Sequence, residues 1–223
     1  MKLLTVSVGR PRDVSWTDRR GRERTDRTGI FKTPVSGRCR MGPTNLDGDG
    51  QADLEAHGGI HKAVYVYDIA NYRYWADRLG RDDFARGGQF GENLTVDGMT
   101  DDVIRIGDVF RIGDAVVEVT QPRVPCFKLG ILMGIPEFHR DFAAELRTGF
   151  YLRVVKPGEI GAGDAFEQIG KAEASMTVRE MMHLLYFDTE NIDGAHKALA
   201  IEALSPGWRQ SFVERIEQAA THP

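Results

Sequence analysis

The segment TQPRVPCFKLG, Thr120–Gly130, concentrates residues that could perform chemistry. It contains Cys126, one of only two cysteines in the 223-residue chain. Arg123 and Lys128 flank this cysteine, and two nearby prolines stiffen the backbone around it. Nearby cations favour the ionised thiol, which is the form that acts as a nucleophile or a metal ligand. A lone cysteine can equally be a buried and inert side chain, so this segment alone leaves both interpretations open.

A second candidate segment is HGGIHK, residues 57–62, in front of a predicted strand. The Gly58-Gly59 pair would let the backbone approach a ligand closely. His57 precedes the pair, and Lys62 adds a positive charge at the start of the strand. A tight turn with an exposed lysine explains the segment equally well.

The third segment, GENLT, places Glu92 and Asn93 between a glycine and the apolar Leu94. A carboxylate in such a place can relay protons or orient a ligand, and an amide can hold a cofactor through hydrogen bonds. The alternative is a surface turn in which the side chains bond to their own backbone.

Motifs for several common cofactors are missing from the sequence. It contains neither G-x-G-x-x-G nor G-x-x-x-x-G-K-[ST], and it carries no flavin fingerprint. An iron–sulfur cluster usually needs four thiolates, which two cysteines cannot supply. We therefore expect no NAD, flavin or Fe–S site in this chain.

The elements that must position these segments are mostly strands. Runs rich in β-branched and aromatic residues predict strands over 3–8, 62–67, 108–113, 115–120 and 150–155. Gly113-Asp114 is typical of a hairpin turn between two of them. Helical spacing follows the N-cap Asp68 as far as Gly80, and returns from Pro136 to Gly149. Because helices do not alternate regularly with strands, we expect a mostly-β barrel or folded sheet with a few helices.

The C-terminal part of the chain is predicted to be helical. Thr177 and Glu180 form a capping box for a helix through Leu185, a second helix is expected over 193–203, and a third begins after Ser205-Pro206. Three short helices bury too little surface to stand alone, so we expect them to pack against the β domain or another subunit. The predicted domains are residues 1–170 and 175–221.

Composition places the chain among soluble globular proteins, with 41% hydrophobic and 28% charged residues. No apolar run approaches the roughly 20 residues of a membrane helix, and two cysteines without a disulfide pattern favour a cytoplasmic location. The net charge of −4 gives no support for stable nucleic-acid binding. The segment from Arg10 to Lys32 contains eight basic and four acidic residues. We expect it to form a solvated loop or hairpin arm.

Taken together, the motifs resemble a known family. The segments HGGIHKAVYVYDIANYRYW, FGENLTVDGMTDDVIRIGDVFRIGDAVVEVTQPRVPCFKL and PVSGR resemble the MOSC domain, named after the C-terminal domain of molybdenum cofactor sulfurase. The tail segments SMTVREMMHLLYF and LSPGWRQSFVERI look like the three-helix (3-alpha) extension of the bacterial YiiM-type members. The resemblance spans nearly the whole chain and implies a MOSC-type β-barrel followed by a small helical domain. The chain leaves no room for the pyridoxal-phosphate (PLP) domain of the namesake enzyme.

The resemblance also implies a molybdenum cofactor (molybdopterin), in which dithiolene sulfurs of a pyranopterin phosphate hold the metal. In the branch that includes the mitochondrial amidoxime-reducing component, a protein cysteine ligates molybdenum, and Cys126 stands at that position. Residue type suggests which side chains bind the cofactor and which take part in catalysis. The cofactor-binding candidates are His57, Gly58, Gly59, Lys62, Glu92, Asn93, Arg123 and Lys128, and the catalytic candidates are Cys126, His57 and Glu92.

The activity implied is reduction of small N-hydroxylated compounds, such as hydroxylaminopurines, hydroxylamines or amidoximes, to amines. Electrons would come from an external donor protein, and the three-helix tail and the basic arm are candidate surfaces for that donor or for a homodimer. One alternative is a carrier that holds the cofactor or a persulfide sulfur on Cys126 without its own turnover. Another is a thiol hydrolase that pairs Cys126 with a histidine.

Overall fold

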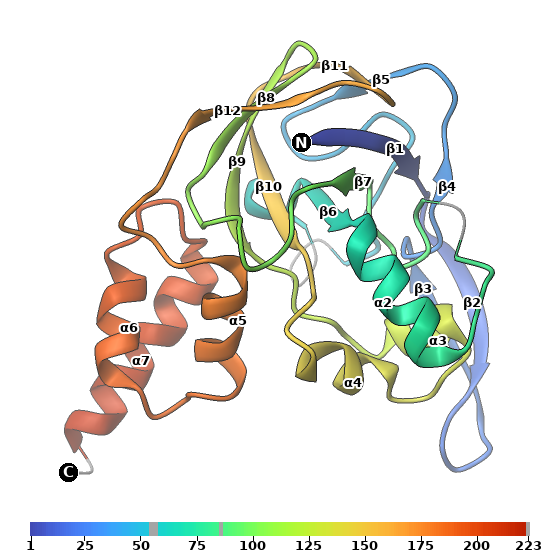
Figure 1. Cartoon of the computed structure of the whole chain (residues 1–223). Helices are drawn as coiled ribbons and strands as arrows, with labels where there is room; N and C mark the ends of the chain where they lie inside the picture. Colours follow the sequence, from blue (N-terminus) through green and yellow to red (C-terminus); the bar gives the residue numbers. More distant parts are fainter. Residues whose placement is uncertain (54–57, 85–86, 222–223) are drawn as a thin grey trace.

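The computed structural model describes residues 1–53, 58–84 and 87–221. Most of the molecule is built on one eight-stranded sheet, with two short strand pairs beside it (Figure 1). The strands of the main sheet are β1 (Lys2–Val8), β4 (Thr33–Pro34), β6 (Val64–Asp68), β7 (Leu94–Asp97), β8 (Val109–Ile112), β9 (Ala115–Pro122), β10 (Phe150–Lys156) and β12 (Phe166–Gly170). Their order is β12-β8-β9-β10-β6-β7-β1-β4, and only β6 and β7 run parallel among these described strands. The short pairs join β5 (Arg38–Met41) with β11 (Gly158–Gly161), and β2 (Arg12–Thr17) with β3 (Glu23–Thr28).

The main sheet curls until β1 meets the residues that lead into β12. The Leu3 N–H donates to the Asp164 carbonyl at 2.9 Å, and the Gly163 N–H donates to the Leu3 carbonyl at 2.8 Å. Lys2 and Ala165 form an antiparallel bridge next to them. The mostly-β, barrel-like architecture expected from the sequence is therefore confirmed.

The interior of this curled sheet and the C-terminal helices share one hydrophobic core. Three helices follow the sheet, namely α5 (Val178–Tyr186), α6 (Ile192–Leu199) and α7 (Pro206–Thr221). Met181 and Phe212 from these helices join Val117 from β9 in the same buried cluster. The Val178 N–H also donates to the Ile104 carbonyl at 2.8 Å. The helices thus pack against the β domain, one of the two arrangements expected from their small size.

A second, aromatic core lies between β6 and three further helices, α2 (Ile69–Leu79), α3 (Lys128–Met133) and α4 (Phe138–Ala144). Trp75 stacks on Phe142 with ring centroids 5.6 Å apart, and its indole N–H donates to the Tyr67 hydroxyl at 3.0 Å. Tyr67 in turn donates to a backbone carbonyl at 3.0 Å. Every buried polar atom in this chain of contacts therefore has a partner, which fixes the three helices against the sheet.

Local capping signals set the helix ends that the sequence predicts well. The Asp68 carboxylate accepts from the Ala70 N–H at 2.8 Å, and Gly80 ends α2 with φ of 60°. The helix predicted from Pro136 to Gly149 is wrong in extent, since α4 is much shorter. Glu137 and Leu146 adopt φ of 64° and 53°, a left-handed conformation that cannot continue a helix.

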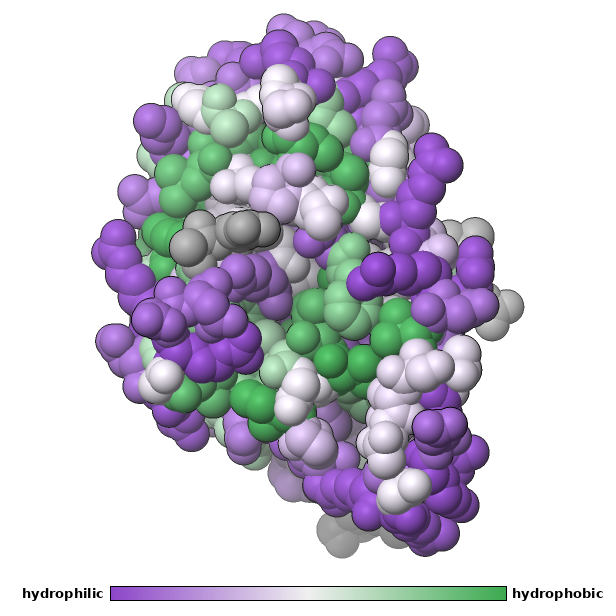
Figure 2. All heavy atoms as spheres, turned by 90° about the vertical axis from the view of Figure 1, so that its right-hand side faces the viewer, coloured by the Kyte–Doolittle hydropathy of each residue, from purple (hydrophilic) through white to green (hydrophobic). Residues whose placement is uncertain are grey.

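The surface is mixed in character. Figure 2 shows hydrophobic residues gathered around the middle of one face, with hydrophilic residues along its outer margins.

The basic segment forms the β2–β3 hairpin, in which Asp18 pairs with Arg22 and Arg24 at 2.9 and 3.2 Å. Within the described ranges, no helix is both long and apolar enough to cross a membrane.

Asp101 is a buried carboxylate that ties α2 to the start of β10. It accepts from the Gly149 N–H at 2.7 Å and from the Asn71 side-chain amide at 3.2 Å. Burial raises the pKa of Asp101 from 3.8 to about 6. The folded protein therefore holds this proton more tightly than the unfolded chain does between about pH 4 and pH 6.

We predict that Asp101→Asn removes a pH-dependent contribution to stability. The contribution of the protonated carboxyl is fully present below about pH 4 and is lost as the pH rises through 6. Across that window, the unfolding free energy of the wild type should fall relative to Asp101→Asn by up to about 3 kcal/mol. Denaturant titrations at several pH values measure this difference. Asp102→Asn is the control, because the pKa of Asp102 is lowered; parallel pH curves for wild type and Asp101→Asn would contradict the prediction.

Candidate functional site

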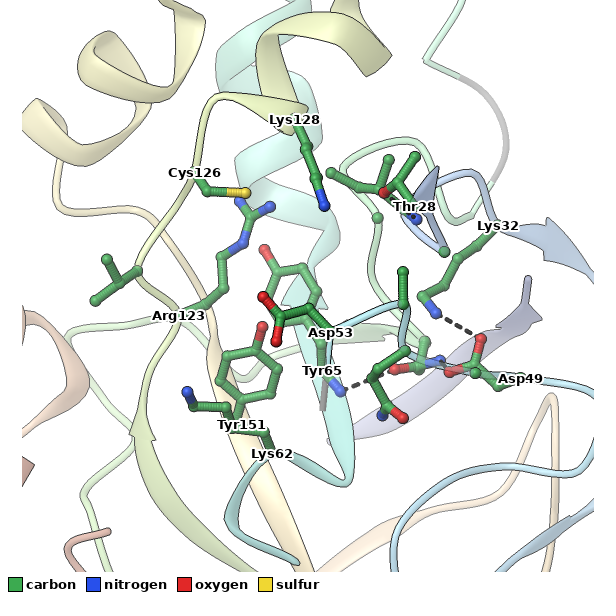
Figure 3. A pocket seen from close by; sticks show the side chains of 18 residues that line it. Thr28, Lys32, Asp49, Asp53, Lys62, Tyr65, Arg123, Cys126, Lys128 and Tyr151 are labelled. Atoms are coloured by element: carbon green, nitrogen blue, oxygen red, sulfur yellow. Dashed lines mark hydrogen bonds and ion pairs between the residues drawn. The ribbon is translucent and has the colours of Figure 1, made fainter. Parts of the chain in front are cut away.

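One cavity, of about 100 Å³, gathers the chemically distinctive side chains of the chain. Segments far apart in sequence meet here: the residues after β3, the loop around residue 50, β6, the turn before β7, the residues after β9, and β10. Figure 3 shows their side chains pointing toward one another around a common space. We call it the cysteine cavity and define it by Lys32, Lys62, Tyr65, Arg123, Cys126 and Lys128.

Arg123 forms the buried part of the cavity wall. Its backbone N–H donates to the Gly149 carbonyl at 2.9 Å, where β9 has ended, and its side chain turns inward. The guanidinium lies 5.0 Å from the Tyr65 ring centroid and 5.3 Å from that of Phe142. Two aromatic faces thus fix its orientation through cation–π contacts.

The charge of Arg123 is left without a full set of acceptors. Arg123 is only 5% exposed, and its Nη1 atom is buried without a hydrogen-bond partner among the described residues. A guanidinium keeps its charge in proteins. Burial raises the pKa values of Tyr65 and Tyr151, so both phenols are neutral at pH 7 and do not offset that charge. An anionic ligand would satisfy both the unused N–H and the buried charge.

Cys126 lies beside this guanidinium at the cavity wall (Figure 3). Its thiol is not in a disulfide and is partly exposed, and its carbonyl accepts the Leu129 N–H at 3.0 Å as α3 begins. Cys39 is also outside any disulfide, but its surroundings differ. It is 7% exposed on β5, its sulfur faces the Asp47 carbonyl at 3.6 Å, and burial raises the pKa of its thiol. Of the two cysteines, Cys126 alone can meet a ligand in this cavity.

Three lysines add positive charge around the cavity. Lys32 pairs with Asp49 at 2.5 Å, and Lys128 donates to a backbone carbonyl of the hairpin at 3.0 Å. Burial lowers the pKa of Lys62, while the charge of Asp53 opposes that shift. The described wall thus contains three lysines and one arginine but only two carboxylates. This excess of positive charge favours an anionic ligand.

Glu92 lies behind the cavity and is not among the described residues that line it. Its carboxylate is fully buried and accepts from two backbone N–H groups of its own loop, at 2.6 and 3.0 Å. The hydroxyls of Thr95 and Tyr72 donate to it as well. Burial raises the pKa of Glu92. The observed contacts hold the loop that brings Gly91 and Asn93 to the cavity.

Asn93 lines the cavity, but its amide already bonds within the protein. Its Oδ1 accepts from the Tyr65 N–H at 3.1 Å. Its Nδ2 donates to the Ser7 carbonyl at 3.2 Å and to Asp49 at 2.9 Å. Asn93 therefore joins three segments of the wall, and both of its amide protons are used.

The HGGIHK segment lies where the cysteine cavity meets a second one. Gly58 and Gly59 line that second cavity together with Cys126, while Lys62 lines both. Gly59 adopts φ of 91°, which a glycine accepts readily, and leads into the short 3₁₀ helix η1 (Ile60–Lys62). His57 lies outside the described residues.

Some wall residues could not be recognised in the sequence. Tyr65 and Tyr151 are direct cross-strand partners on β6 and β10, but in the sequence each is only an aromatic residue within a predicted strand. Lys32 and Asp49 gave no signal, because their pairing depends on two loops that meet only in the fold. Alternation along a strand can indicate that Tyr65 and Tyr67 share a face, but not what that face covers.

Comparison with known proteins gives consistent matches along the chain. The MOSC domain model matches residues 53–167, and the model of the YiiM-like 3-alpha helix domain matches residues 176–219. YflK of Bacillus subtilis (strain 168) is 37% identical over 216 residues, which cover 97% of this chain and 95% of YflK. A protein named Reductase from Gibberella moniliformis (strain M3125 / FGSC 7600) is 32% identical over 158 residues, which cover 70% of this chain and 28% of that longer protein.

The fold has a close counterpart among solved structures as well. The crystal structure of YiiM from Geobacillus stearothermophilus has a TM-score of 0.79 and 29% identity, covering 96% of this chain and 98% of that one. Sequence and structure thus agree on both parts of the chain, the curled sheet and the helices that follow it. The chain belongs to the MOSC domain family and carries the YiiM-like three-helix domain at its C-terminal end.

Proposed function

We propose that the protein binds molybdenum cofactor in the cysteine cavity and reduces N-hydroxylated compounds to amines. The observation that carries the proposal is the buried Arg123 guanidinium, with an unused N–H, beside the Cys126 thiol. A cationic donor suits the anionic groups of the cofactor, and a thiolate suits a soft, sulfur-bound metal. MOSC domains are associated with this cofactor, which supports the assignment.

The residues of the cavity fit such a group. Within the described part of the chain, no three His, Cys, Asp or Glu side chains gather as a purely protein metal site would require. A metal at Cys126 would therefore bring most of its ligands with it, as a metal chelated by a dithiolene does. Arg123, Lys62 and Lys128 would hold the anionic part of the cofactor. When bound, the cofactor supplies two-electron transfer of an oxygen atom from the substrate.

The reaction balances with one external reductant. An N–OH group, two electrons and two protons give an N–H group and water, so the N–O bond breaks. Lys62 and Tyr151 bear protons and line both cavities next to Cys126. Burial lowers the pKa of Lys62, so its Nζ proton is released more readily. The electrons would come from a separate redox protein, and the relative named Reductase supports a reductive role.

We predict that Cys126→Ala abolishes dithionite-driven reduction of 6-hydroxylaminopurine. Wild type purified from a molybdenum-replete host should contain about one molybdenum per chain. Loss of a residue that only supports a metal ligand typically lowers activity roughly 10- to 100-fold. Because Cys126 is the proposed ligand itself, the activity of the variant should fall by more than this. Cys39→Ala, at the other cysteine, is the matched control and should retain turnover.

Each part of this proposal has its own contrary result. Wild type that takes up no molybdenum contradicts cofactor binding. Loaded wild type without turnover supports the carrier alternative instead of the reductase. Equal rates for Cys126→Ala and wild type contradict the role of Cys126.

A second prediction concerns the buried charge. Arg123→Met keeps an unbranched apolar stem but removes the guanidinium, a charge-assisted donor, so cofactor affinity should fall about 10- to 100-fold. A buried charge whose Nη1 has no hydrogen-bond partner also destabilises the cofactor-free protein. Cofactor-free Arg123→Met should therefore unfold at a temperature no lower than cofactor-free wild type. Molybdenum content after dialysis and thermal unfolding measure the two effects.

The control is Arg111→Met, an exposed arginine on β8 that pairs with Glu167 at 2.8 Å. It should retain molybdenum as wild type does. Undiminished molybdenum content in Arg123→Met would show that the guanidinium does not hold the cofactor.

A further inference from the structure

The β2–β3 hairpin is an arm that buries little surface of its own. No residue of β2 is buried, and in β3 only its last residue, Thr28, is. No hairpin residue belongs to either of the hydrophobic cores described above. The turn of the hairpin projects past α3 at the right of Figure 1. Since a two-stranded hairpin has only marginal stability by itself, this arm is an exposed element that the cores do not require.

The arm carries positive charge on a molecule that is otherwise negative. The eight basic and four acidic residues from Arg10 to Lys32 give this segment a net charge of +4, whereas the whole chain carries −4. The rest of the sequence therefore carries −8. Such a separation of charge orients an approaching charged molecule before contact. A protein with an acidic patch is attracted to the arm and repelled by the remainder of the chain.

The arginines of the arm are available to a partner. Arg22, Arg24 and Arg27 pair with carboxylates of the hairpin itself, and their side chains are 47% to 62% exposed. Exposed pairs of this kind contribute little to stability, so a carboxylate of a partner can replace them. Arg10 and Arg20 are exposed and make no ion pair within the described part of the chain.

An apolar patch lies beside these arginines and next to Cys126. Phe127, the residue after the cysteine, is 41% exposed, and its ring centroid lies 5.5 Å from that of Trp16 on β2. Ile131 is four residues further along, on the same face of α3, and is partly exposed. Trp16 is paired across the hairpin with Arg24. An aromatic and apolar centre with arginines around it is typical of a protein–protein interface.

The hairpin is also joined to the wall of the cysteine cavity. The Lys128 Nζ donates to the Arg27 carbonyl at 3.0 Å, and Thr28, at the end of β3, lines the cavity. A protein bound to the arm and the apolar patch would therefore come close to Cys126. Proximity matters for an electron donor, because the rate of electron transfer falls steeply with distance.

We propose that the β2–β3 hairpin and the apolar patch of Trp16, Phe127 and Ile131 form the docking surface for an acidic electron-donor protein. This inference rests on the proposed function, in which a separate redox protein supplies electrons to the site at Cys126. Breaking one N–O bond consumes two electrons and two protons, so a one-electron donor must bind and leave twice in each turnover. A small surface with charge attraction suits such brief encounters.

A second copy of the chain and a nucleic acid suit this surface less well. In a symmetric dimer the same patch meets itself, so arginines would face arginines. A nucleic acid is negative along its whole length, so it would also meet the acidic remainder of the chain. A compact protein with a local acidic patch can contact the arm alone.

The binding test does not depend on turnover or on the cofactor. The chain has three tryptophans, Trp16, Trp75 and Trp208, so ¹⁵N-indole labelling gives three side-chain signals, and Trp16→Phe assigns the first. Oxidised flavodoxin, a small acidic flavoprotein, should shift the Trp16 signal at low ionic strength, and added salt should weaken the shift. Trp75 is fully buried in the aromatic core and should not respond. Reduced cytochrome c, a basic redox protein, should leave Trp16 unmoved.

The kinetic test reverses charge on the arm of the cofactor-loaded protein. Arg10→Glu with Arg20→Glu should raise KM for reduced flavodoxin roughly 10-fold at low ionic strength, the lower end of the range for electrostatic steering. Ile131→Glu places a charge in the apolar patch and should raise the same KM. The dithionite-driven rate should stay as in wild type, because dithionite needs no protein interface. Lys156→Glu with Lys197→Glu is the matched control, since it changes the net charge equally at exposed lysines on β10 and α6.

The outcomes separate the docking surface from the proposed function. If flavodoxin leaves Trp16 unmoved, or both double variants raise its KM equally, the docking assignment is wrong although the reductase stands. A wild-type dimer that Arg10→Glu with Arg20→Glu dissociates, or a larger Trp16 shift with DNA than with flavodoxin, would also overturn it. If flavodoxin shifts Trp16 in wild type alone, but dithionite drives no turnover, the docking surface is supported and the proposed reaction is wrong.

Discussion

The buried charge of Arg123 is the constraint around which the site is organised. A guanidinium cannot discard its proton, so the fold must hold it in place while leaving one of its N–H groups unused. Two aromatic rings contact the guanidinium through cation–π interactions. The Arg123 backbone N–H donates to the Gly149 carbonyl, and the Gly149 N–H donates to the Asp101 carboxylate. The protein therefore accepts a local loss of stability that an anionic ligand would recover.

The carboxylate of Glu92 shows how position decides what a residue type does. From the sequence it is a candidate proton relay, and its raised pKa is also a common feature of catalytic acids. In the fold, however, its oxygens bond to its own loop and to Thr95 and Tyr72. These contacts support a positioning role, in which the carboxylate shapes the loop that presents Asn93.

Features that depend on short stretches of chain could be predicted, whereas long-range ones could not. Asp68 as a cap and Thr177 with Glu180 as a capping box are local, and the structure has both. Helix α3 escaped prediction because Lys128–Met133 is too short to develop a periodic pattern. The pairing of Lys32 with Asp49, and the fact that Trp208 and Cys126 line one cavity, depend on folded topology, which local spacing does not encode. The family resemblance predicted more than local spacing did, because it implied the whole fold as well as the individual motifs.

The wall that the two cavities share has a consequence for the catalytic cycle. Cys126, Lys62 and Tyr151 can be approached from either side. Under the proposed function, the smaller, more cationic side would hold the anionic part of the cofactor, while substrate and product would exchange through the larger side. Product release would then leave the prosthetic group undisturbed, so one loaded chain could serve many successive substrates. A competitive inhibitor that fills the larger side would stop the reaction without extracting the metal.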